Sequence, residues 1–294
     1  MGHQDYPSLT LSSSHRQILG RQYLVTDPYT KDAVLIDTVL DYDPASGTLS
    51  TATADGILAF VRHHGFHVTK ILETHAHADH LTASQYIKHH LPGDIPICIG
   101  ERIAQVQKHF GPVYGLAPQN LSMSFDVFLK DDDVFMIGSL PVQVLHLPGH
   151  TPDHVGYLVG KSVFTGDSIF MPDLGSARAD FPGGDARALY RSLQKLLSLP
   201  DDYEIFVGHD YPNGRDKNCA TTVVEQREHN KHVKSGTTER DFVDFRTTRD
   251  KVLKAPRLIH PSLQVNVRAG RLPPPDPTTG LSYFRTPLYG ALNI

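Results

Sequence analysis

The chain has 294 residues, of which 39% are hydrophobic and 20% are charged, and its formal net charge at pH 7 is −4. These values are typical of a globular protein with one large core, and the absence of a Lys/Arg block argues against a general nucleic-acid partner. Two cysteines, Cys98 and Cys219, are too few for a disulfide framework. We therefore expect a reducing compartment, which favours the cytoplasm and leaves the mitochondrion open.

The first 131 residues are expected to alternate strands and helices behind a loose lead-in at 1–14. The N-terminus resembles neither a secretory signal nor an Arg-rich transit peptide, and no apolar run approaches the roughly 20 residues that span a bilayer. Residues 111–131 lack periodicity and are interpreted as an irregular insertion or lid. Apolar runs bounded by turn residues predict strands at 22–26, 33–37, 68–72 and 95–99, and helices at 53–64, 81–91 and 101–110.

The second half is expected to contain hairpins, then helices, then an extended tail. Two sheets facing each other, with helices outside, would accommodate this order of elements. The last forty residues hold seven prolines, so we expect them to run as extended loop without a core of their own. The predicted strands are 134–137, 142–146, 155–159, 162–165 and 204–207, and the predicted helices are 185–197, 221–232 and 239–254.

Four potential metal ligands follow the third predicted strand, in the stretch Thr-His-Ala-His-Ala-Asp-His at 74–80. Residues two apart in an extended loop point the same way, so His75 and His77 can approach one metal together. Asp79 and His80 are expected to begin the next helix, where they can face a second metal. The alternative for Asp79 is a plain helix N-cap.

Three further residues that can bind a metal each lie after a predicted strand, and each is directly preceded by a glycine. They are His150, Asp167 and His209, in the dipeptides Gly-His, Gly-Asp and Gly-His. A glycine is expected where the backbone must come close to a metal or make a tight turn. Each residue alone is weak evidence, but ligands at several strand ends meet at one sheet edge, and this predicts a metal site.

The ordered set Thr-His-x-His-x-Asp-His, Gly-His, Gly-Asp and Gly-His resembles the metallo-β-lactamase superfamily over about residues 15–215. The resemblance implies an α/β fold, the αββα sandwich, with the metal at the edge between the sheets. We divide the chain into a metallo-β-lactamase-like catalytic domain, 15–235, and an extension, 236–294, made of a helix and an extended Pro-rich tail packed on the same body. All seven ligands of the superfamily are present: His75, His77, Asp79, His80, His150, Asp167 and His209.

The ligand inventory permits two chemistries. One is a glyoxalase II-like hydrolase, in which Asp167 bridges two zinc ions and a thioester such as S-lactoylglutathione is cleaved. The flanking residues resemble persulfide dioxygenases instead, of the ethylmalonic-encephalopathy type. That resemblance rests on the sequences Gly-His-Thr-Pro at 149–152, Phe-Thr-Gly-Asp at 164–167, Arg-Ala-Asp-Phe at 178–181, Leu-Tyr-Arg-Ser-Leu at 189–193 and His-Asp-Tyr at 209–211.

Resemblance to persulfide dioxygenases implies one Fe(II) per chain, held by His75, His150 and Asp167 as a two-histidine, one-carboxylate triad. The implied reaction converts glutathione persulfide, or a related small persulfide, with O₂ and water to sulfite and the thiol. Arg178 and Tyr211 are the implied substrate-side residues, and Tyr211 is also assigned to catalysis. The remaining four ligands are expected to support catalysis around the iron: His77, Asp79, His80 and His209.

Further expectations concern differences from human-type persulfide dioxygenases and the binding partners of this protein. The chain has Gly-Ser-Ala-Arg at 175–178 where human-type members have Gly-Cys-Gly-Arg, which opens the question of the thiol carrier. We expect no nucleic-acid or membrane partner, and a homodimer is one option among oligomeric states. A metal-free binding module is the third hypothesis, and the retention of all seven ligands argues against it.

Overall fold

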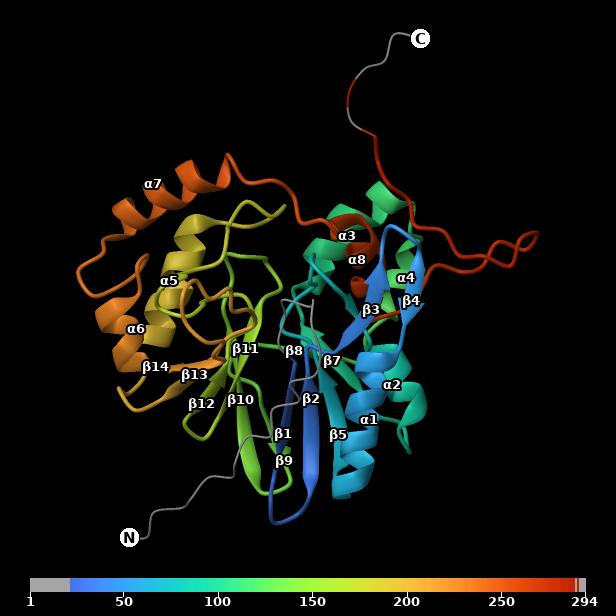
Figure 1. Cartoon of the computed structure of the whole chain (residues 1–294), viewed down its shortest axis with the longest axis horizontal. Coiled ribbons are helices and arrows are strands. Elements are labelled where there is room, and N and C mark those ends of the chain that lie inside the picture. The colour runs from blue at the N-terminus through green and yellow to red at the C-terminus, as the bar shows by residue number, and fades with distance from the viewer. Residues whose placement is uncertain (1–21, 289, 291–294) are drawn as a thin grey trace.

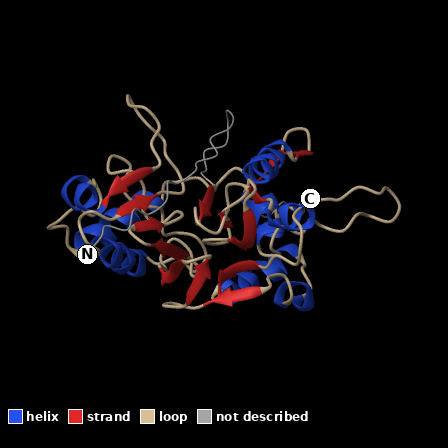
Figure 2. Ribbon diagram, turned by 90° about the horizontal axis from the view of Figure 1, so that it is seen from below, coloured by secondary structure: helices blue, strands red, loops and turns tan. Residues whose placement is uncertain are grey.

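The protein consists of two mixed sheets that face each other, with helices on their outer sides (Figures 1 and 2). The computed structural model describes residues 22–288 and 290, so the predicted lead-in at 1–14 lies outside the described residues. The buried side chains between the sheets come from both of them, for example Val34 and Ile36 from one and Val144 and Tyr157 from the other. The predicted αββα sandwich is therefore confirmed.

Five strands form the first sheet, in the order β1-β2-β5-β7-β8. Only β1 and β2 pair antiparallel, while β2, β5, β7 and β8 are mutually parallel. The carboxyl ends of the parallel strands therefore meet at one edge, where ligands bind in open α/β sheets. The strands are β1 (Tyr23–Thr26), β2 (Asp32–Ile36), β5 (His67–Leu72), β7 (Ile97–Gly100) and β8 (Val127–Leu129), and the neighbouring helices are α1 (Ala52–His64), α2 (Ser84–His90) and α3 (Ile103–Tyr114).

Six strands form the second sheet, in the order β14-β13-β12-β11-β10-β9, with only β12 and β13 parallel. Helix α5 packs on it through leucines spaced three to four apart, of which Leu189, Leu193 and Leu196 are completely buried. The strands are β9 (Val134–Ile137), β10 (Leu140–His146), β11 (Val155–Val159), β12 (Ser162–Phe164), β13 (Glu204–Phe206) and β14 (Ala220–Thr222), and the helices are α5 (Ala186–Leu197), α6 (Val223–His229) and α7 (Glu239–Asp250).

A small third sheet corrects the prediction of a helix at 81–91. Its order is β4-β3-β6, and β6 (Leu81–Thr82) pairs antiparallel with β3 (Val39–Asp43), which also pairs with β4 (Thr48–Ser50). Helix α2 begins only at Ser84. Asp79 and His80 consequently lie in a turn before a strand, and the helix N-cap alternative for Asp79 is wrong.

The segment 111–131 contains helices and a strand, so the prediction that it is irregular is wrong, while its role as an insertion or lid stays a prediction. Helix α3 continues to Tyr114 with Pro112 inside it, α4 covers Pro118–Ser122, and β8 completes the first sheet. Pro118 stands in the first turn of α4, where the missing N–H leaves no intrahelical hydrogen bond unmade. Both prolines of this segment thus lie within helices.

Helix α8 (Ile259–Asn266) corrects the expectation that the last forty residues run as extended loop throughout. Its Leu263 and Val265 are completely buried in the core beside the first sheet. Residues 271–288 form no helix or strand among the described residues, as their prolines predict, and run as an extended trace in Figure 1. No helix in the described part of the chain is long and apolar enough to cross a membrane. The division at 235 stays a prediction.

Candidate metal centre

Asp37 shapes the ligand loop that follows β5. It lies directly after the neighbouring parallel strand β2, with a left-handed backbone (φ 54°). Its carboxylate accepts hydrogen bonds from the Thr74 backbone N–H at 2.7 Å and the Thr74 hydroxyl at 2.9 Å, and it lies 3.1 Å from His77 Nε2. A single aspartate thereby fixes the start of the loop and one face of His77.

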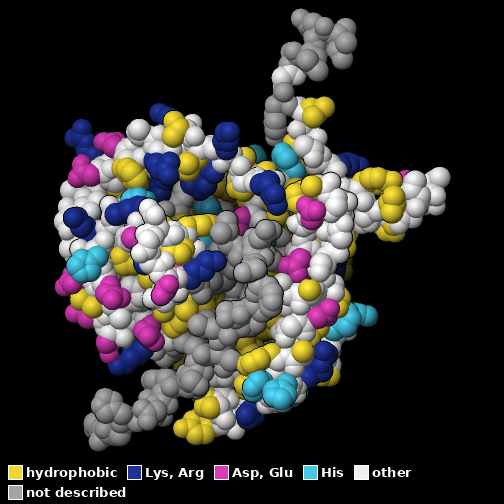
Figure 3. All heavy atoms as spheres, viewed as in Figure 1, with side chains coloured by type: hydrophobic (Ala, Val, Ile, Leu, Met, Phe, Trp, Pro, Cys, Tyr) yellow, Lys and Arg dark blue, Asp and Glu magenta, His cyan; other side chains and the backbone are white. Residues whose placement is uncertain are grey.

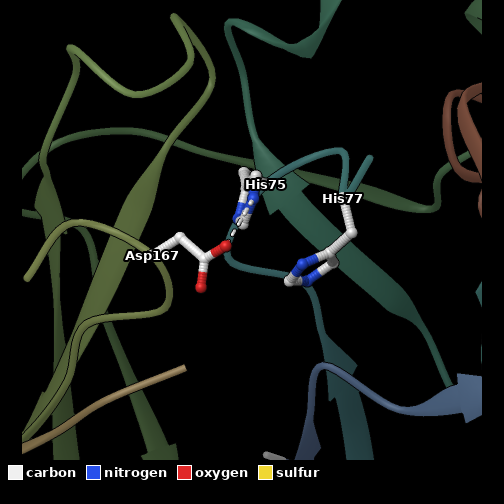
Figure 4. Close-up of side chains that lie close together, drawn as sticks. All are labelled: His75, His77 and Asp167. Carbon is white, nitrogen blue, oxygen red and sulfur yellow. Dashed lines mark ion pairs between the residues drawn. The ribbon is translucent and has the colours of Figure 1, made fainter. Parts of the chain in front are cut away.

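Thr74 in turn sets the tautomer of His75. Because the Thr74 hydroxyl donates its proton to Asp37, its lone pair accepts from His75 Nδ1 at 3.0 Å. The proton of His75 then lies on Nδ1 and leaves Nε2 as a bare lone pair. That nitrogen is 4.0 Å from Asp167 Oδ2, on the opposite loop (Figure 4).

His150 approaches the same carboxylate oxygen from another side. Its Nδ1 donates to the carbonyl oxygen of Arg178 at 2.8 Å, and its Nε2 lies 4.0 Å from Asp167 Oδ2. The rings of His75 and His150 meet edge to face with centroids 5.1 Å apart. His75 and His150 therefore both direct Nε2 toward one carboxylate, and the three residues are the donor set that the resemblance implies for iron.

The second oxygen of Asp167 faces a second group of ligands. His209 Nε2 lies 3.2 Å from Asp167 Oδ1 and 3.3 Å from Asp79 Oδ2, and His80 Nδ1 lies 3.4 Å from Asp79 Oδ1. Asp167 thus stands between two sets of donors. The ligand atoms of His75, His77 and Asp167, drawn in Figure 4, all lie within 4.8 Å of one another, and so do those of Asp79, Asp167 and His209.

The remaining predicted site residues lie in the same cavity. It measures about 870 Å³ and is lined by His150, Asp167, Arg178, His209 and Tyr211, among others. The Arg178 guanidinium makes two hydrogen bonds to Asp180, so its predicted substrate contact stays a prediction. The Tyr211 ring stacks on His209 at 5.7 Å.

Basic side chains from the C-terminal part of the chain also line the cavity. Lys231, Arg249 and Arg257 are exposed there, and Arg246 is buried against Asp250. Lys and Arg side chains gather on the upper part of the face shown in Figure 3. The predicted motifs did not include these basic residues.

Electrostatics divides the buried histidines into two kinds. Burial, followed by the neighbouring His77 and His154, keeps the pKa of His75 well below its usual range, so this imidazole is neutral. Burial also acts to lower the pKa of His77, but the carboxylates of Asp37, Asp79 and Glu73 outweigh it and raise that pKa to about 9. His75 is therefore ready to bind a metal, whereas His77 must first release a proton.

Unpaired nitrogens in the buried cluster fit a metal ion. Among the described residues, neither His75 Nε2 nor His80 Nε2 has a hydrogen-bond partner. Leaving a buried polar atom without a partner costs about 1–3 kcal/mol. Neutral imidazoles and carboxylates are ligands for both iron and zinc. The donor set therefore fits a metal without deciding between them.

His154 is a positioning residue that the motif analysis overlooked. It is completely buried, and its ring stacks on His75 at 4.6 Å. Its Nε2 accepts the backbone N–H of Asp167 at 3.1 Å, and its Nδ1 lies 3.2 Å from the Ser168 hydroxyl. It joins a histidine ligand to the carboxylate loop. Its position four residues after His150 was the available signal.

The ligand-preceding glycines are explained by close approaches. A Cβ on Gly149 would lie 2.2 Å from the backbone nitrogen of Leu189, and one on Gly166 would lie 2.4 Å from the Thr74 hydroxyl. A Cβ on Gly208 would lie 2.4 Å from Asp167 Oδ1. These close approaches are to other parts of the protein, so the expected approach of the backbone to a metal stays a prediction.

Comparison with known proteins places the chain in a family. Residues 19–209 match the model of the Metallo-beta-lactamase superfamily. The chain belongs to the metallo-beta-lactamase superfamily. A probable metallo-hydrolase of Burkholderia pseudomallei is 45% identical over 90% of this chain and 94% of its own length. The Glyoxylase B2 of Dictyostelium discoideum is 44% identical over 91% of this chain and 92% of its own length.

Two proteins named ETHE1 and one named a beta-lactamase hydrolase-like protein are also similar to this chain. The mitochondrial persulfide dioxygenase ETHE1 of Bos taurus is 30% identical over 86% of this chain and 85% of its own length. The crystal structure of ETHE1 from Myxococcus xanthus superposes with a TM-score of 0.68 at 31% identity, covering 86% of this chain and 95% of that one. A beta-lactamase hydrolase-like protein of Xylella fastidiosa is 47% identical, and this chain spans 62% of its length.

Proposed function

We propose that the chain is a persulfide dioxygenase that uses one non-haem iron(II) ion to oxidise glutathione persulfide or a related low-molecular-weight persulfide. The observation that carries the proposal is the approach of His75 and His150 to the same oxygen of Asp167, each at 4.0 Å. Two histidines and one carboxylate form the facial triad of iron(II) oxygenases, which leaves positions open for substrate and O₂. The similarity to the ETHE1 proteins supports this choice.

The protein side of the reaction is binding, orientation and proton control. When bound, iron(II) supplies the redox chemistry by which a persulfide, O₂ and water become the thiol, sulfite and two protons. Burial, with Asp167 and Asp79 nearby, raises the pKa of Tyr211 above its usual value of 10, so its hydroxyl keeps its proton and can donate to the substrate. Arg178, held by Asp180, presents a cation in the same cavity for a substrate carboxylate.

A two-zinc thioester hydrolase is the second candidate. Asp79 and His209 gather around Oδ1 of Asp167 while His75 and His150 face Oδ2, which is the arrangement of a carboxylate that bridges two metals. The relatives named as a metallo-hydrolase and as a glyoxylase favour this alternative. The same seven residues serve both candidates, three as iron ligands in the first and all seven as zinc ligands in the second, so the bound metal and the substrate distinguish them.

The deciding experiment measures metal content and two reactions on one preparation. Protein purified without added zinc is analysed for iron and zinc, then assayed for O₂ uptake with glutathione persulfide and for cleavage of S-lactoylglutathione. The proposal expects one iron per chain, O₂ uptake and sulfite. Two zinc ions per chain and thioester cleavage without O₂ uptake would overturn it.

A matched pair of variants tests the assignment of ligands. His150→Ala removes a member of the proposed triad, and His209→Ala removes a histidine on the other side of Asp167. We expect His150→Ala to abolish iron binding and His209→Ala to retain it. Equal metal loss in the two variants would instead support a dinuclear site.

A further inference from the structure

Asn266, the last residue of α8, reaches the metal-binding loop from 186 residues away in the sequence. Its Nδ2 donates to the carbonyl oxygens of His77 at 2.8 Å and His80 at 2.7 Å. Its Oδ1 accepts the backbone N–H of Thr82 at 2.9 Å. The side chain is 3% exposed, so these hydrogen bonds are shielded from water. One amide therefore closes the turn that carries three of the seven superfamily ligands, His77, Asp79 and His80.

The chemistry of an amide is required at this position. Two carbonyl oxygens need two donors and the N–H needs an acceptor, and Asn supplies both from one short side chain. An aspartate in the same volume would offer only acceptors to the two carbonyls. An alanine would leave both carbonyls and the Thr82 N–H buried without these partners, which is unfavourable for each of the three groups.

Helix α8 holds Asn266 rigidly. The flanking Val265 and Val267 are completely buried, and Gly270 approaches the Thr82 carbonyl so closely that a Cβ there would lie 3.2 Å from it. A fixed amide of this kind sets the direction of the peptide groups on both sides of Asp79. The side chain of Asp79 in turn contacts His209 at 3.3 Å.

We propose that Asn266 is a positioning residue for the metal centre, so that α8 of the C-terminal extension is an integral part of the site. It contacts no metal or substrate itself. It acts by holding the backbone of the turn 77–82, from which His77, Asp79 and His80 project. Partners behind metal ligands are worth roughly 10–100-fold in metal affinity. The inference deepens the proposed site, because His77, Asp79 and His80 would support the iron triad of the dioxygenase and would bind metal directly in the two-zinc hydrolase.

Gln264 is a matched control on the same helix. It is 2% exposed and also makes three side-chain hydrogen bonds, but to the His260 carbonyl and to the backbone of Arg285 in the tail. Gln264→Ala therefore removes a comparable buried amide that does not touch the metal loop. Asn266→Asp accompanies Asn266→Ala because it preserves volume and keeps an acceptor for Thr82.

The experiment measures the zinc(II) dissociation constant of the full chain by competition with a chromophoric chelator, together with urea unfolding of the metal-free protein. The visible spectrum of the cobalt(II)-loaded protein reports ligand geometry independently. We expect Asn266→Ala and Asn266→Asp to weaken zinc binding about 10–100-fold and to alter the cobalt spectrum. Gln264→Ala should change zinc affinity less than twofold.

Two outcomes would overturn the proposal. One is that the Asn266 variants lose unfolding free energy as Gln264→Ala does, yet bind zinc with unchanged affinity and give an unchanged cobalt spectrum. The other is that Gln264→Ala weakens zinc binding as much as Asn266→Asp, which would make the effect one of helix stability. Because no turnover is measured, failure of this inference is separable from failure of the dioxygenase assignment.

Discussion

Replacement of Gly208 by alanine tests whether the close packing behind the metal ligands is functional. The Cβ of an alanine would lie 2.4 Å from Asp167 Oδ1 and 2.8 Å from the Gly166 carbonyl carbon. Gly208 also donates its N–H to the Gly166 carbonyl at 2.8 Å, so the two loops cannot separate without losing that hydrogen bond. The carboxylate must therefore move, and with it the oxygen that faces His209.

The expected change in the free energy of unfolding of Gly208→Ala follows from two opposing effects. Overpacking typically costs about 1–3 kcal/mol, while a glycine-to-alanine change restricts the unfolded chain and returns about 0.4–1 kcal/mol. The free energy of unfolding of the metal-free protein should therefore fall by about 1–2 kcal/mol. Displacement of a ligand should also weaken zinc or iron binding at least tenfold, which corresponds to about 1.4 kcal/mol.

Gly111→Ala is the control for this prediction. Gly111 lies inside α3, away from the ligands, and its added Cβ would meet a terminal methyl group of the Leu121 side chain at 2.8 Å. Helix propensity favours the alanine by about 1 kcal/mol and offsets the contact. Urea unfolding of the metal-free proteins measures the stability of each variant, and chelator competition measures its metal affinity. Equal stability and equal metal affinity in the two variants would refute the reasoning.

Two further predictions concern stability. Asp27 accepts hydrogen bonds from the Ser139 N–H and hydroxyl and from the Tyr29 N–H. Burial acts to raise the pKa of Asp27, but these hydrogen bonds outweigh burial and lower the pKa to about 2. The ionised carboxylate therefore stabilises the fold above about pH 4, so Asp27→Asn should lower the free energy of unfolding at pH 7. Urea titrations should show that the difference in unfolding free energy between the unaltered protein and the variant shrinks as the pH falls from 4 toward 2. Asp185 caps α5 by accepting the Ala188 N–H at 2.7 Å; Asp185→Ala should cost about 1 kcal/mol in urea unfolding, and a change below about 0.3 kcal/mol would contradict the capping role.

Local patterns in the sequence were sufficient to predict facing sheets and the convergence of the ligands, and the family resemblance implied the αββα sandwich. Apolar runs bounded by turns identify strands such as β5 and β10, and strand ends meet at a sheet edge. His75, His150 and Asp167 were therefore predicted to lie together, and they do. Their assignment to iron stays a prediction, since spacing does not distinguish one metal from two.

Features that depend on distant contacts were not predicted. Helix α8 contains Pro261 in its first turn and buries the polar side chains of Gln264 and Asn266, so its sequence resembles a polar, proline-containing loop. Only a hydrogen-bond partner elsewhere in the chain makes such burial favourable. Asp37 was taken as the end of a strand, and its role depends on the parallel neighbour β5, which a one-dimensional pattern does not reveal.

Hydrogen bonds that join the two sheets next to the ligands explain why the site is preorganised. The Tyr157 hydroxyl of the second sheet donates to the Glu73 carbonyl at 2.7 Å, and the Val155 N–H donates to the Thr74 carbonyl at 2.8 Å. On the other side, the Tyr23 hydroxyl of the first sheet donates to the Val207 carbonyl at 2.5 Å. These bonds fix the loops that carry His75 and His209 against the facing sheets. The ligand geometry is thus a property of the fold, which suits more than one metal, and specificity must come from the cavity around it.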